Sequence, residues 1–374
     1  MHVGLNAQLL SLAENYRGAG ISWYIYNLLR QLPGMDSPHQ FSVFLNERRY
    51  VDKGMSLRYT SWPTQRPLAR IMWEQLLLPA QLRRQRVDLL HAMAFAGPLL
   101  FQGPMVVTVY DLSFLRFPQA FRPWNRWYLS QFTRWSARRA RHVIAISEST
   151  RQDVIDFLGV PADRVTVVYC GADPMFRSLP PEQIGEYRRQ HNLPDQFVLF
   201  LGTLEPRKNL DRLLRAYAEW RKVDPRAPHL VIAGAQGWYY HAVLNLVHGL
   251  GLEESVIFLG YVAREDLPLL YNNAHMFVYP SLFEGFGLPV LEAMACGVPV
   301  ITSNVSSLPE VAGEAAVLVD PTSTDQLRES LVSLWRDSDR RRELAAQGGR
   351  QASRFTWKRT AEQTLSVYER AMDT

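Results

Sequence analysis

Short runs of apolar, largely β-branched residues recur along the chain, separated by stretches with helical periodicity. They lie at His2 to Leu5, Val106 to Leu112, His142 to Ser147, Arg164 to Gly171, Phe197 to Thr203, His229 to Gly234, Ser255 to Gly260, His275 to Pro280 and Val298 to Ser303. Uninterrupted runs of this length are typical of strands buried on both faces, and their alternation with helices is typical of parallel sheets with right-handed crossovers. The pattern predicts an α/β protein with doubly wound sheets.

The chain has 374 residues, more than one ordinary core accommodates, so we expect two domains. A polar segment with four prolines separates the strands that end at Gly171 and begin at Phe197, as is typical of an interdomain crossing. We predict domains over residues 1–175 and 176–352. Residues 353–374 have apolar positions at helical spacing from Phe355 to Tyr368 and predict an amphipathic helix that packs back towards the first domain.

Composition places the chain among globular proteins, with 47% hydrophobic and 21% charged residues. There is no basic leader segment and no apolar run of about 18 residues, and the two cysteines, Cys170 and Cys296, are too few for a disulfide framework. We expect a cytoplasmic protein. The net charge of +5 is modest, so we do not expect a nucleic-acid partner, although a non-enzymatic nucleic-acid binder is the rival of another class.

The loop after the strand at Phe197 to Thr203 carries a basic pair. The chain turns at Gly202, and a helix is predicted to begin near Asn209. Arg207 and Lys208 would then lie at a helix entrance, where the helix dipole favours anions, and together they suit a diphosphate. The alternative is a solvated basic pair on a surface loop.

Two glutamates flank a glycine turn after the strand at His275 to Pro280. Glu284 lies in the loop, Pro289 suits the first position of a helix, and Gly297 suits its end. Glu292 is then expected in the first turn of this helix. Ligands of doubly wound sheets bind beyond the carboxyl ends of the strands, so we expect these loops to line a cleft.

Carboxylates in such a place can accept hydrogen bonds from the vicinal hydroxyls of a sugar or ribose. The backbone amides near Phe286, Gly287 and Leu288 are expected to face the same ligand. Alternatively, Glu292 merely complements the helix dipole, worth ~0.3 to 1 kcal/mol, and Glu284 is a surface residue. A third glycine turn, at Gly18 and Gly20, precedes an amphipathic helix and would allow amides to approach phosphate or sugar.

The segment Arg122 to His142 has six arginines, no acidic residue, and aromatic residues interleaved among them. As a helix it could lie on an anionic membrane and receive a lipid-linked acceptor. The alternative is a core-packed helix with an arginine-rich outer face. The sequence Asp337-Ser338-Asp339 spells a D-x-D motif, but its position after an amphipathic helix favours a solvated helix junction over a metal site.

These motifs together resemble the retaining glycosyltransferases of family 4, the "glycosyl transferases group 1" type with the GT-B fold. The resemblance covers almost the whole chain. It is carried by GAGISWYIYNLL, VYDLSFLRFP, RARHVIAISESTRQDV, VVYCGADPMF, GTLEPRKNLDRLLRAY, FLGYVAREDLPLLYNNA, EGFGLPVLE and SSLPEVAGEAAVLVDP. It implies two Rossmann-like domains facing a central cleft, the first binding the acceptor and the second binding a nucleotide-sugar donor.

The resemblance also implies roles for individual residues. Arg207 and Lys208 match the clamp of the donor diphosphate, Glu284 the acid that contacts the transferred sugar, and Glu292 the acid that holds the ribose. The remaining donor contacts match the Phe286 to Leu288 amides, Gly202, the glycine turn at Gly18 or Gly20, and the backbone near Gly260 and Tyr261.

One position departs from the family pattern. Relatives commonly carry a His-Asp pair where this sequence has Tyr110 and Asp111. Since the family histidine lies by the transferred sugar, the change bears on sugar preference or on activity itself. A tyrosine hydroxyl can donate and accept hydrogen bonds but cannot replace an imidazolium.

The resemblance predicts transfer of a hexose from GDP-mannose or a UDP-sugar to a glycan or lipid-linked acceptor, with no cofactor and no metal. Arg207, Lys208 and helix-end amides would stabilise the departing nucleoside diphosphate, whose phosphate takes the acceptor proton. A nucleotide-sugar epimerase or phosphorylase of the same fold and an impaired sugar-nucleotide-binding protein are the alternatives.

Overall fold

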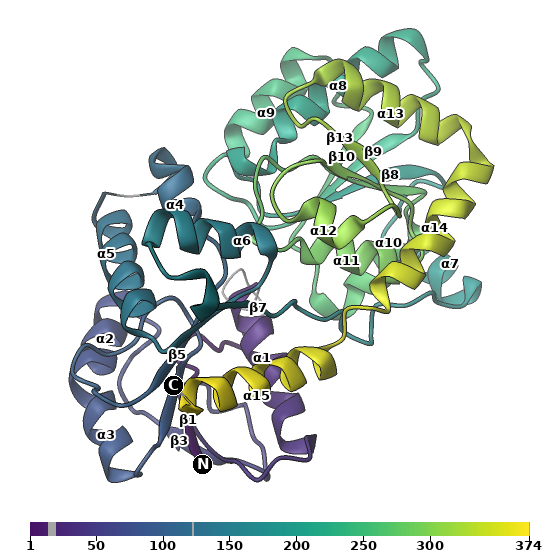
Figure 1. Cartoon of the computed structure of the whole chain (residues 1–374). Coiled ribbons are helices and arrows are strands. Elements are labelled where there is room, and N and C mark those ends of the chain that lie inside the picture. Colours follow the sequence, from purple (N-terminus) through teal and green to yellow (C-terminus); the bar gives the residue numbers. More distant parts are fainter. Residues whose placement is uncertain (14–19, 122, 374) are drawn as a thin grey trace. The chain divides into compact units, whose positions relative to one another are not determined.

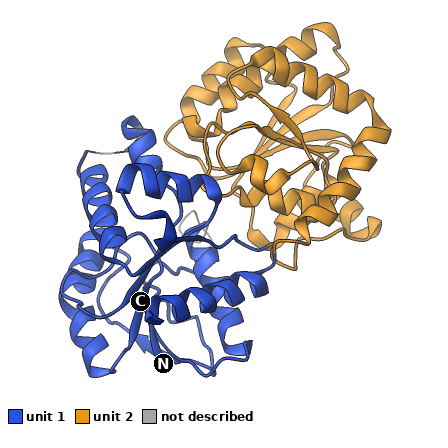
Figure 2. Cartoon of the chain, viewed as in Figure 1, with its two compact units in different colours: residues 1–13, 17–171, 356–374 blue, residues 14–16, 172–355 orange. Residues whose placement is uncertain are grey.

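The computed structural model describes residues 1–13, 20–121 and 123–373 and divides the chain into two compact units (Figure 2). Of the described residues, unit 1 holds those up to 171 and those from 356 onwards, and unit 2 holds 172–355. The predicted limits were 175 and 352. The expectation of an α/β protein with two parallel sheets is confirmed.

Unit 1 is built on a seven-stranded parallel sheet with the order β3-β2-β1-β4-β5-β6-β7. Its strands are β1 His2–Asn6, β2 Gln40–Leu45, β3 Ser56–Tyr59, β4 Leu89–Ala92, β5 Met105–Val109, β6 His142–Ala145 and β7 Val165–Val167. Its helices are α1 Ile21–Gln31, α2 Pro67–Met72, α3 Leu78–Arg84, α4 Ser113–Arg116, α5 Pro123–Arg139, α6 Glu148–Asp153 and α15 Trp357–Asp373. π-Helical turns η3 (Trp73–Leu77) and η5 (Val154–Leu158) follow α2 and α6.

Unit 2 has a six-stranded parallel sheet with the order β10-β9-β8-β11-β12-β13. Its strands are β8 Phe197–Leu201, β9 His229–Ala233, β10 Val256–Gly260, β11 Met276–Tyr279, β12 Val300–Ser303 and β13 Val317–Val319. Its helices are α7 Pro181–Gln190, α8 Leu210–Val223, α9 Tyr240–Gly249, α10 Leu267–Asn273, α11 Leu288–Ala295, α12 Leu308–Ala312, α13 Thr324–Arg336 and α14 Ser338–Ala352. Helices α8, α9 and α13 cover one face of the sheet and α10, α11 and α12 the other (Figure 1).

The strand order places a topological switch point in each sheet. In unit 2 the chain winds outward from β8 to β10 and then returns to add β11 on the other side of β8. The loops that leave β8 and β11 therefore diverge to opposite faces at the carboxyl edge, which is where open α/β sheets bind ligands. In unit 1 the corresponding pair is β1 and β4.

The apolar runs predicted strands β1 and β5 to β12, but four strands escaped the pattern. Strand β3 is largely exposed and has no continuous apolar run, and β13 is apolar but only three residues long. Ser42 interrupts β2 and His91 interrupts β4, although both side chains are buried in the sheet. The predicted interdomain crossing was wrong in one respect, because it contains helix α7, which packs against α10 in unit 2.

The described chain crosses between the units at residues 171–172 and again at residues 355–356. The two crossing segments contact each other on both sides of the boundary. The amide of Ala172 donates to the Phe355 carbonyl at 2.9 Å. Gly171 lies so close to the other passage that a Cβ atom there would approach the Trp357 nitrogen to 2.2 Å, so only glycine fits.

The predicted C-terminal helix is α15, which packs on α1 and on the sheet of unit 1. Its buried Tyr368 hydroxyl lies 2.7 Å from Nδ1 of His91, whose Nε2 lies 2.8 Å from the Thr108 hydroxyl. Burial lowers the pKa of His91 to about 3, so the ring stays neutral and both its nitrogens are paired.

We expect Tyr368→Phe to destabilise the protein by about 1 to 3 kcal/mol, because it leaves a buried His91 nitrogen without its partner. Urea unfolding monitored by circular dichroism measures the loss. Tyr240→Phe, at a half-buried tyrosine of unit 2, is the matched control and should change stability little. Equal effects of the two substitutions would contradict the assignment.

Candidate active site

Two loops meet at the switch point of unit 2. The loop after β8 contains the 3-10 turn Pro206–Lys208 and enters α8, and the loop after β11 enters α11. One of the groups that join them is the carbonyl of Arg207, which accepts hydrogen bonds from the Leu282 amide at 2.9 Å and from the Ser281 hydroxyl at 3.0 Å. The basic pair and the first glutamate are thereby held against each other.

Glu284 accepts hydrogen bonds on both carboxylate oxygens. Arg207 Nη1 lies 2.8 Å from Oε2, and Lys208 Nζ lies 2.7 Å from Oε1. The Ser281 and Tyr279 hydroxyls also donate to Oε1, at 2.6 and 3.0 Å. We call these five residues the Glu284 cluster. It carries two cations and one carboxylate at the carboxyl edge of the sheet.

The Glu284 cluster is buried, with Glu284 only 8% and Lys208 only 9% exposed. Burial alone would raise the pKa of Glu284, but Arg207 and Lys208 outweigh it and lower the pKa to about 2. Burial, aided by the neighbouring Arg207 charge, lowers the pKa of Lys208. Arg207 and Lys208 are therefore not a solvated surface pair, and Glu284 is not a surface residue, so both of these alternatives are wrong.

Further hydrogen bonds hold the backbone of these loops. Asn209 adopts a left-handed conformation (φ 59°) at the start of α8, and its side-chain Nδ2 donates to the carbonyls of Pro280 and Pro321 at 2.9 and 2.7 Å. The Ser307 hydroxyl donates to the carbonyls of Glu284 and Phe286. Asn209 occupies the predicted cap position, but its side chain ties three loops together instead of capping α8.

The predicted amide loop follows Glu284 directly. Phe286 is buried against Phe355, with ring centroids 5.8 Å apart. Gly287 has a φ of 109° and Leu288 is the first residue of α11, which has no side-chain cap. Pro289 is therefore the second helical residue and not the first, while Gly297 (φ 72°) follows the helix end as predicted.

Glu292 is the fifth residue of α11, so the expectation that it lies in the first turn was wrong. Its carboxylate accepts a hydrogen bond from the Tyr271 hydroxyl at 3.2 Å and lies 3.5 Å from Arg264 Nη1. Burial raises the pKa of Glu292 to about 7, against the opposing effects of Arg264 and Tyr271. The helix-dipole explanation therefore does not apply, since the residue lies beyond the first turn.

Arg264 was not singled out from the sequence. Its guanidinium lies between two carboxylates, because Nη2 is 3.2 Å from Asp173 Oδ2 while Nη1 faces Glu292. It also lies over the Phe176 ring, 5.2 Å from the centroid. Arg264 thus orients Glu292 and connects it to the start of unit 2.

Of the two glycines that meet at this edge of the sheet, Gly202 and Gly234, it is Gly234 whose lack of a side chain is required. A Cβ atom at Gly234 (φ 139°) would approach the Gly202 carbonyl oxygen to 2.1 Å, so the loops after β8 and β9 meet only because Gly234 has no side chain. A Cβ atom at Gly202 itself would meet only ordinary contacts, starting at 3.7 Å from Lys208. Tyr261, about half exposed, follows Gly260 (φ 69°) at the end of β10.

The predicted site residues of unit 1 differ in their exposure, since Tyr110 is buried and Asp111 is half-buried. Tyr110 is buried between Tyr24 and Phe95, and its hydroxyl donates to the Met93 carbonyl at 2.6 Å. Burial raises its pKa well above the ordinary value. Tyr110 is a packing residue, and its expected catalytic contact finds no support in this geometry. Asp111 accepts the Ser113 amide at 2.8 Å and so supports the start of α4.

The glycine turn before α1 is partly described. Gly20 immediately precedes α1 and has a φ of 53°, a conformation that favours glycine. Gly18 lies outside the described residues.

The D-x-D motif forms a helix junction. Asp337 accepts the Arg340 amide at the start of α14, and Asp339 pairs with Arg342. Within the described ranges, no three His, Cys, Asp or Glu side chains gather in a group suited to a metal ion.

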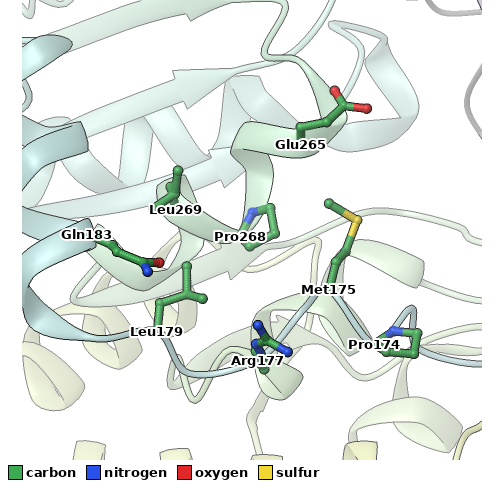
Figure 3. Close-up of a pocket in the computed structure, with 8 residues that line it drawn as sticks. All are labelled: Pro174, Met175, Arg177, Leu179, Gln183, Glu265, Pro268 and Leu269. Carbon is green, nitrogen blue, oxygen red and sulfur yellow. The ribbon is translucent and has the colours of Figure 1, made fainter.

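A pocket of about 460 Å³ lies elsewhere in unit 2 (Figure 3). Leu179, Gln183 and Leu269 lie on one side of it, and Met175 and Glu265 on the other. None of the predicted site residues lines this pocket, so it is separate from the Glu284 cluster.

Comparison with known proteins decides the family. Residues 183–351 match the family described as "Glycosyl transferases group 1", and residues 18–176 match "Glycosyltransferase Family 4". The chain is 37% identical over 268 residues to the O-antigen chain mannosyltransferase B of Escherichia coli, covering 71% of this chain and 70% of that relative. The chain belongs to the family 4 glycosyltransferases.

Other comparisons agree with this assignment. The glycosyltransferase is 35% identical over 238 residues to the serotype-specific mannosyltransferase WbdA of Escherichia coli, a match that spans 63% of this chain but only 29% of that longer relative. Sucrose-phosphate synthase from Thermosynechococcus elongatus superimposes with a TM-score of 0.79 at 21% identity, covering 100% of this chain and 99% of that one. The fold of the glycosyltransferase is GT-B.

Some residues of the glycosyltransferase site were missed from the sequence, although signals existed. Tyr279 is the last residue of β11 and Ser281 follows two positions later, at the strand end where ligand-facing groups of α/β sheets occur. Arg264 also lies in a turn that follows a strand, but its two carboxylate partners, Asp173 and Glu292, are distant in the sequence and become visible only in the fold.

We expect Glu284→Gln to destabilise the glycosyltransferase by about 3 kcal/mol, because it leaves the buried Lys208 and the half-buried Arg207 without their counter-charge. Chemical denaturation measures the loss. Adding Lys208→Met to Glu284→Gln should recover part of it, with a coupling energy of about 1 to 3 kcal/mol.

Glu219→Gln is the matched control for this cycle, because it breaks an exposed pair with Lys222 on α8. Exposed pairs contribute little, so its effect should be negligible. A double mutant no more stable than Glu284→Gln would show that the Glu284 cluster is not a coupled unit.

Proposed function

We propose that this glycosyltransferase transfers a mannosyl residue from GDP-mannose, with retention of anomeric configuration and without a metal ion, to a glycan or lipid-linked acceptor. The observation that carries the proposal is the Glu284 cluster, in which two cations meet a carboxylate at the switch point of the donor-binding unit. The similarity to two mannosyltransferases supports mannose as the transferred sugar. A UDP-sugar is the alternative donor.

The proposed chemistry follows from the charges of the cluster. The donor diphosphate accepts hydrogen bonds from Arg207 and Lys208, which stabilise the negative charge that develops as the bond from C1 to the phosphate oxygen breaks. The acceptor oxygen bonds to C1 on the same face, and its proton passes to the leaving phosphate oxygen. Glu284 keeps the two cations in place and accepts a hydrogen bond from the sugar.

Glu292 serves the other end of the donor in this proposal. Its carboxylate accepts hydrogen bonds from the two ribose hydroxyls, and Arg264 orients it and favours its ionised form. The amides at Phe286, Gly287 and Leu288 and the turn at Gly202 border the diphosphate, and Tyr261 borders the base. The domain roles proposed are acceptor binding for unit 1 and donor binding for unit 2.

Arg207→Ala should lower kcat/KM for mannosyl transfer at least about 100-fold, because it removes charge stabilisation from the transition state. Glu284→Ala should reduce transfer by more than it weakens GDP binding, because the sugar contact is lost in addition to the anchor of Arg207 and Lys208, whereas Glu292→Ala should weaken GDP binding directly. Transfer of radiolabelled mannose to an oligomannose acceptor and calorimetric titration with GDP measure these effects.

Arg215→Ala, at an exposed arginine on α8, is the control and should retain full activity. A titration with UDP and UDP-glucose in parallel tests the alternative donor. Tight GDP binding without any transfer or hydrolysis would favour the impaired binding protein, and release of free mannose 1-phosphate with phosphate as acceptor would favour a phosphorylase.

GDP-mannose affinity should rise roughly tenfold from pH 6 to pH 8, because ribose hydroxyls donate to the ionised form of Glu292 and its pKa is about 7. The diphosphate of the intact donor is esterified on both sides and does not titrate in this range. Arg264→Met removes the cation that favours ionisation, so the midpoint should move to higher pH. In Glu292→Gln the pH profile should be flat, and a profile unchanged by both substitutions would contradict the role of Glu292.

A further inference from the structure

Large apolar side chains are exposed mainly in one of the two units. Of the fifteen exposed large hydrophobic residues among those described, only Val223, Trp238 and Tyr261 lie in unit 2. Unit 1 has the other twelve, and several of these lie on consecutive elements. A contiguous patch of exposed apolar side chains is typical of a surface that binds a protein or a membrane.

An apolar stripe runs along α2 and η3. Leu68, Met72 and Leu76 recur every four residues and are between 51% and 65% exposed. Trp73, on the same element, is 1% exposed and belongs to the core of unit 1. The element is therefore apolar on its outer face as well as its inner face, which its own packing does not require.

The stripe continues onto the loop after β4. The Gln75 side chain donates to the Gly97 carbonyl at 3.3 Å and accepts the Leu99 amide at 2.8 Å, which holds the exposed Leu99 beside η3. The Gly97 amide in turn donates to the Ser136 hydroxyl of α5 at 3.0 Å. Figure 1 shows α2, α3 and α5 on the same side of unit 1.

Helix α5 adds two tryptophans. Trp124 and Trp127 are 61% and 52% exposed and stack on each other with ring centroids 5.2 Å apart. The buried residues of α5 lie in its second half, at Thr133, Ser136 and Ala137. The predicted alternative of a core-packed helix thus describes only that second half, and the first half exposes its two tryptophans.

The charge on these elements has one sign. Residues 63–86 contain five arginines and residues 118–141 contain six, while the only acidic residue in both stretches is Glu74. Glu74 is buried and accepts a hydrogen bond from Asn6 at 3.1 Å, and burial raises its pKa. Arg66 and Arg70 flank Leu68 along α2, and Arg126 lies between Trp124 and Trp127 on α5. The later arginines of the second stretch are used differently, because Arg134, Arg138 and Arg141 donate to the carbonyls of Phe157, Leu158 and Ala371.

We propose that this surface, formed by Leu68, Met72, Leu76, Leu99, Trp124 and Trp127 with their surrounding arginines, docks onto an anionic lipid bilayer. Apolar and tryptophan side chains enter the headgroup region while arginines contact anionic lipid headgroups. A second copy of the chain would bring arginines against arginines, which disfavours a self-contact. In the part of the chain that the structure describes, no helix has the length and hydrophobicity of a membrane span, so the contact is peripheral. The proposal rests on unit 1 alone and is independent of the donor chemistry.

The test is flotation of the full chain with vesicles of phosphatidylglycerol and phosphatidylcholine in equal amounts, against vesicles of phosphatidylcholine alone. We expect binding to the anionic vesicles that weakens as salt rises, and little binding to the neutral ones. Met72→Ser with Leu76→Ser, and separately Trp127→Ser, should each weaken binding about tenfold. Arg126→Gln should weaken it roughly fivefold on anionic vesicles only.

Val223→Ser and Trp238→Ser, at exposed apolar positions of unit 2, are the matched controls and should leave vesicle binding unchanged. All variants alter exposed side chains, so unchanged circular dichroism and thermal midpoints establish that they are folded. Binding to neither vesicle type, or equal binding by the stripe variants and the controls, would overturn the proposal. A dimer in light scattering that Met72→Ser with Leu76→Ser dissociates, without vesicle binding, would assign the surface to self-association instead.

Discussion

The candidate site depends on a buried carboxylate that two neighbouring cations hold in its charged form. Taking Glu284 and Lys208 out of water is costly, and the cost is offset only because Arg207, Ser281 and Tyr279 complete the hydrogen bonds of the carboxylate. Neither loop could keep its shape if the other moved, since the charge on one compensates the charge on the other. The Glu205 carboxylate lies 3.8 Å from Arg207 Nη2, so two cations face two carboxylates and their charges balance.

Two glutamates eight positions apart occupy opposite electrostatic environments. Arg207 and Lys208 lower the pKa of Glu284 and keep it ionised, whereas burial raises the pKa of Glu292 to about 7. One carboxylate is thus a fixed charge that organises its neighbours, and the other can gain or lose a proton near neutral pH. Environments that separate the pKa values of paired carboxylates are typical of functional sites.

Much of the fold could be predicted because buried parallel strands leave continuous apolar runs, as at Met105–Val109 and Phe197–Leu201. Strands with polar or exposed positions, such as Ser56–Tyr59, leave no such trace. The site residues also differ in whether the sequence pattern reveals them. Arg207, Lys208, Glu284 and Glu292 could be found because each lies in a loop or helix that follows a strand.

The partners of these residues could not be found in the same way. The pairing of Glu284 with both cations, and of Arg264 with Glu292, joins residues that are distant in the sequence, so only the folded arrangement shows them. Tyr110 shows the opposite error. The resemblance pointed to a sugar contact at this position, whereas the Tyr110 side chain is buried and its hydroxyl donates to the Met93 carbonyl.

The return of the chain to unit 1 has a consequence for synthesis in the cell. Tyr368 and His91 are 277 positions apart, so the part of the first sheet that α15 covers, around β5 and β6, stays exposed until that helix has left the ribosome. Unit 2 is complete in sequence by residue 355 and can fold before unit 1 is finished. Unit 1 is therefore synthesised first but completed last. A chain that lacks α15 would leave apolar residues of the unit 1 sheet exposed to solvent.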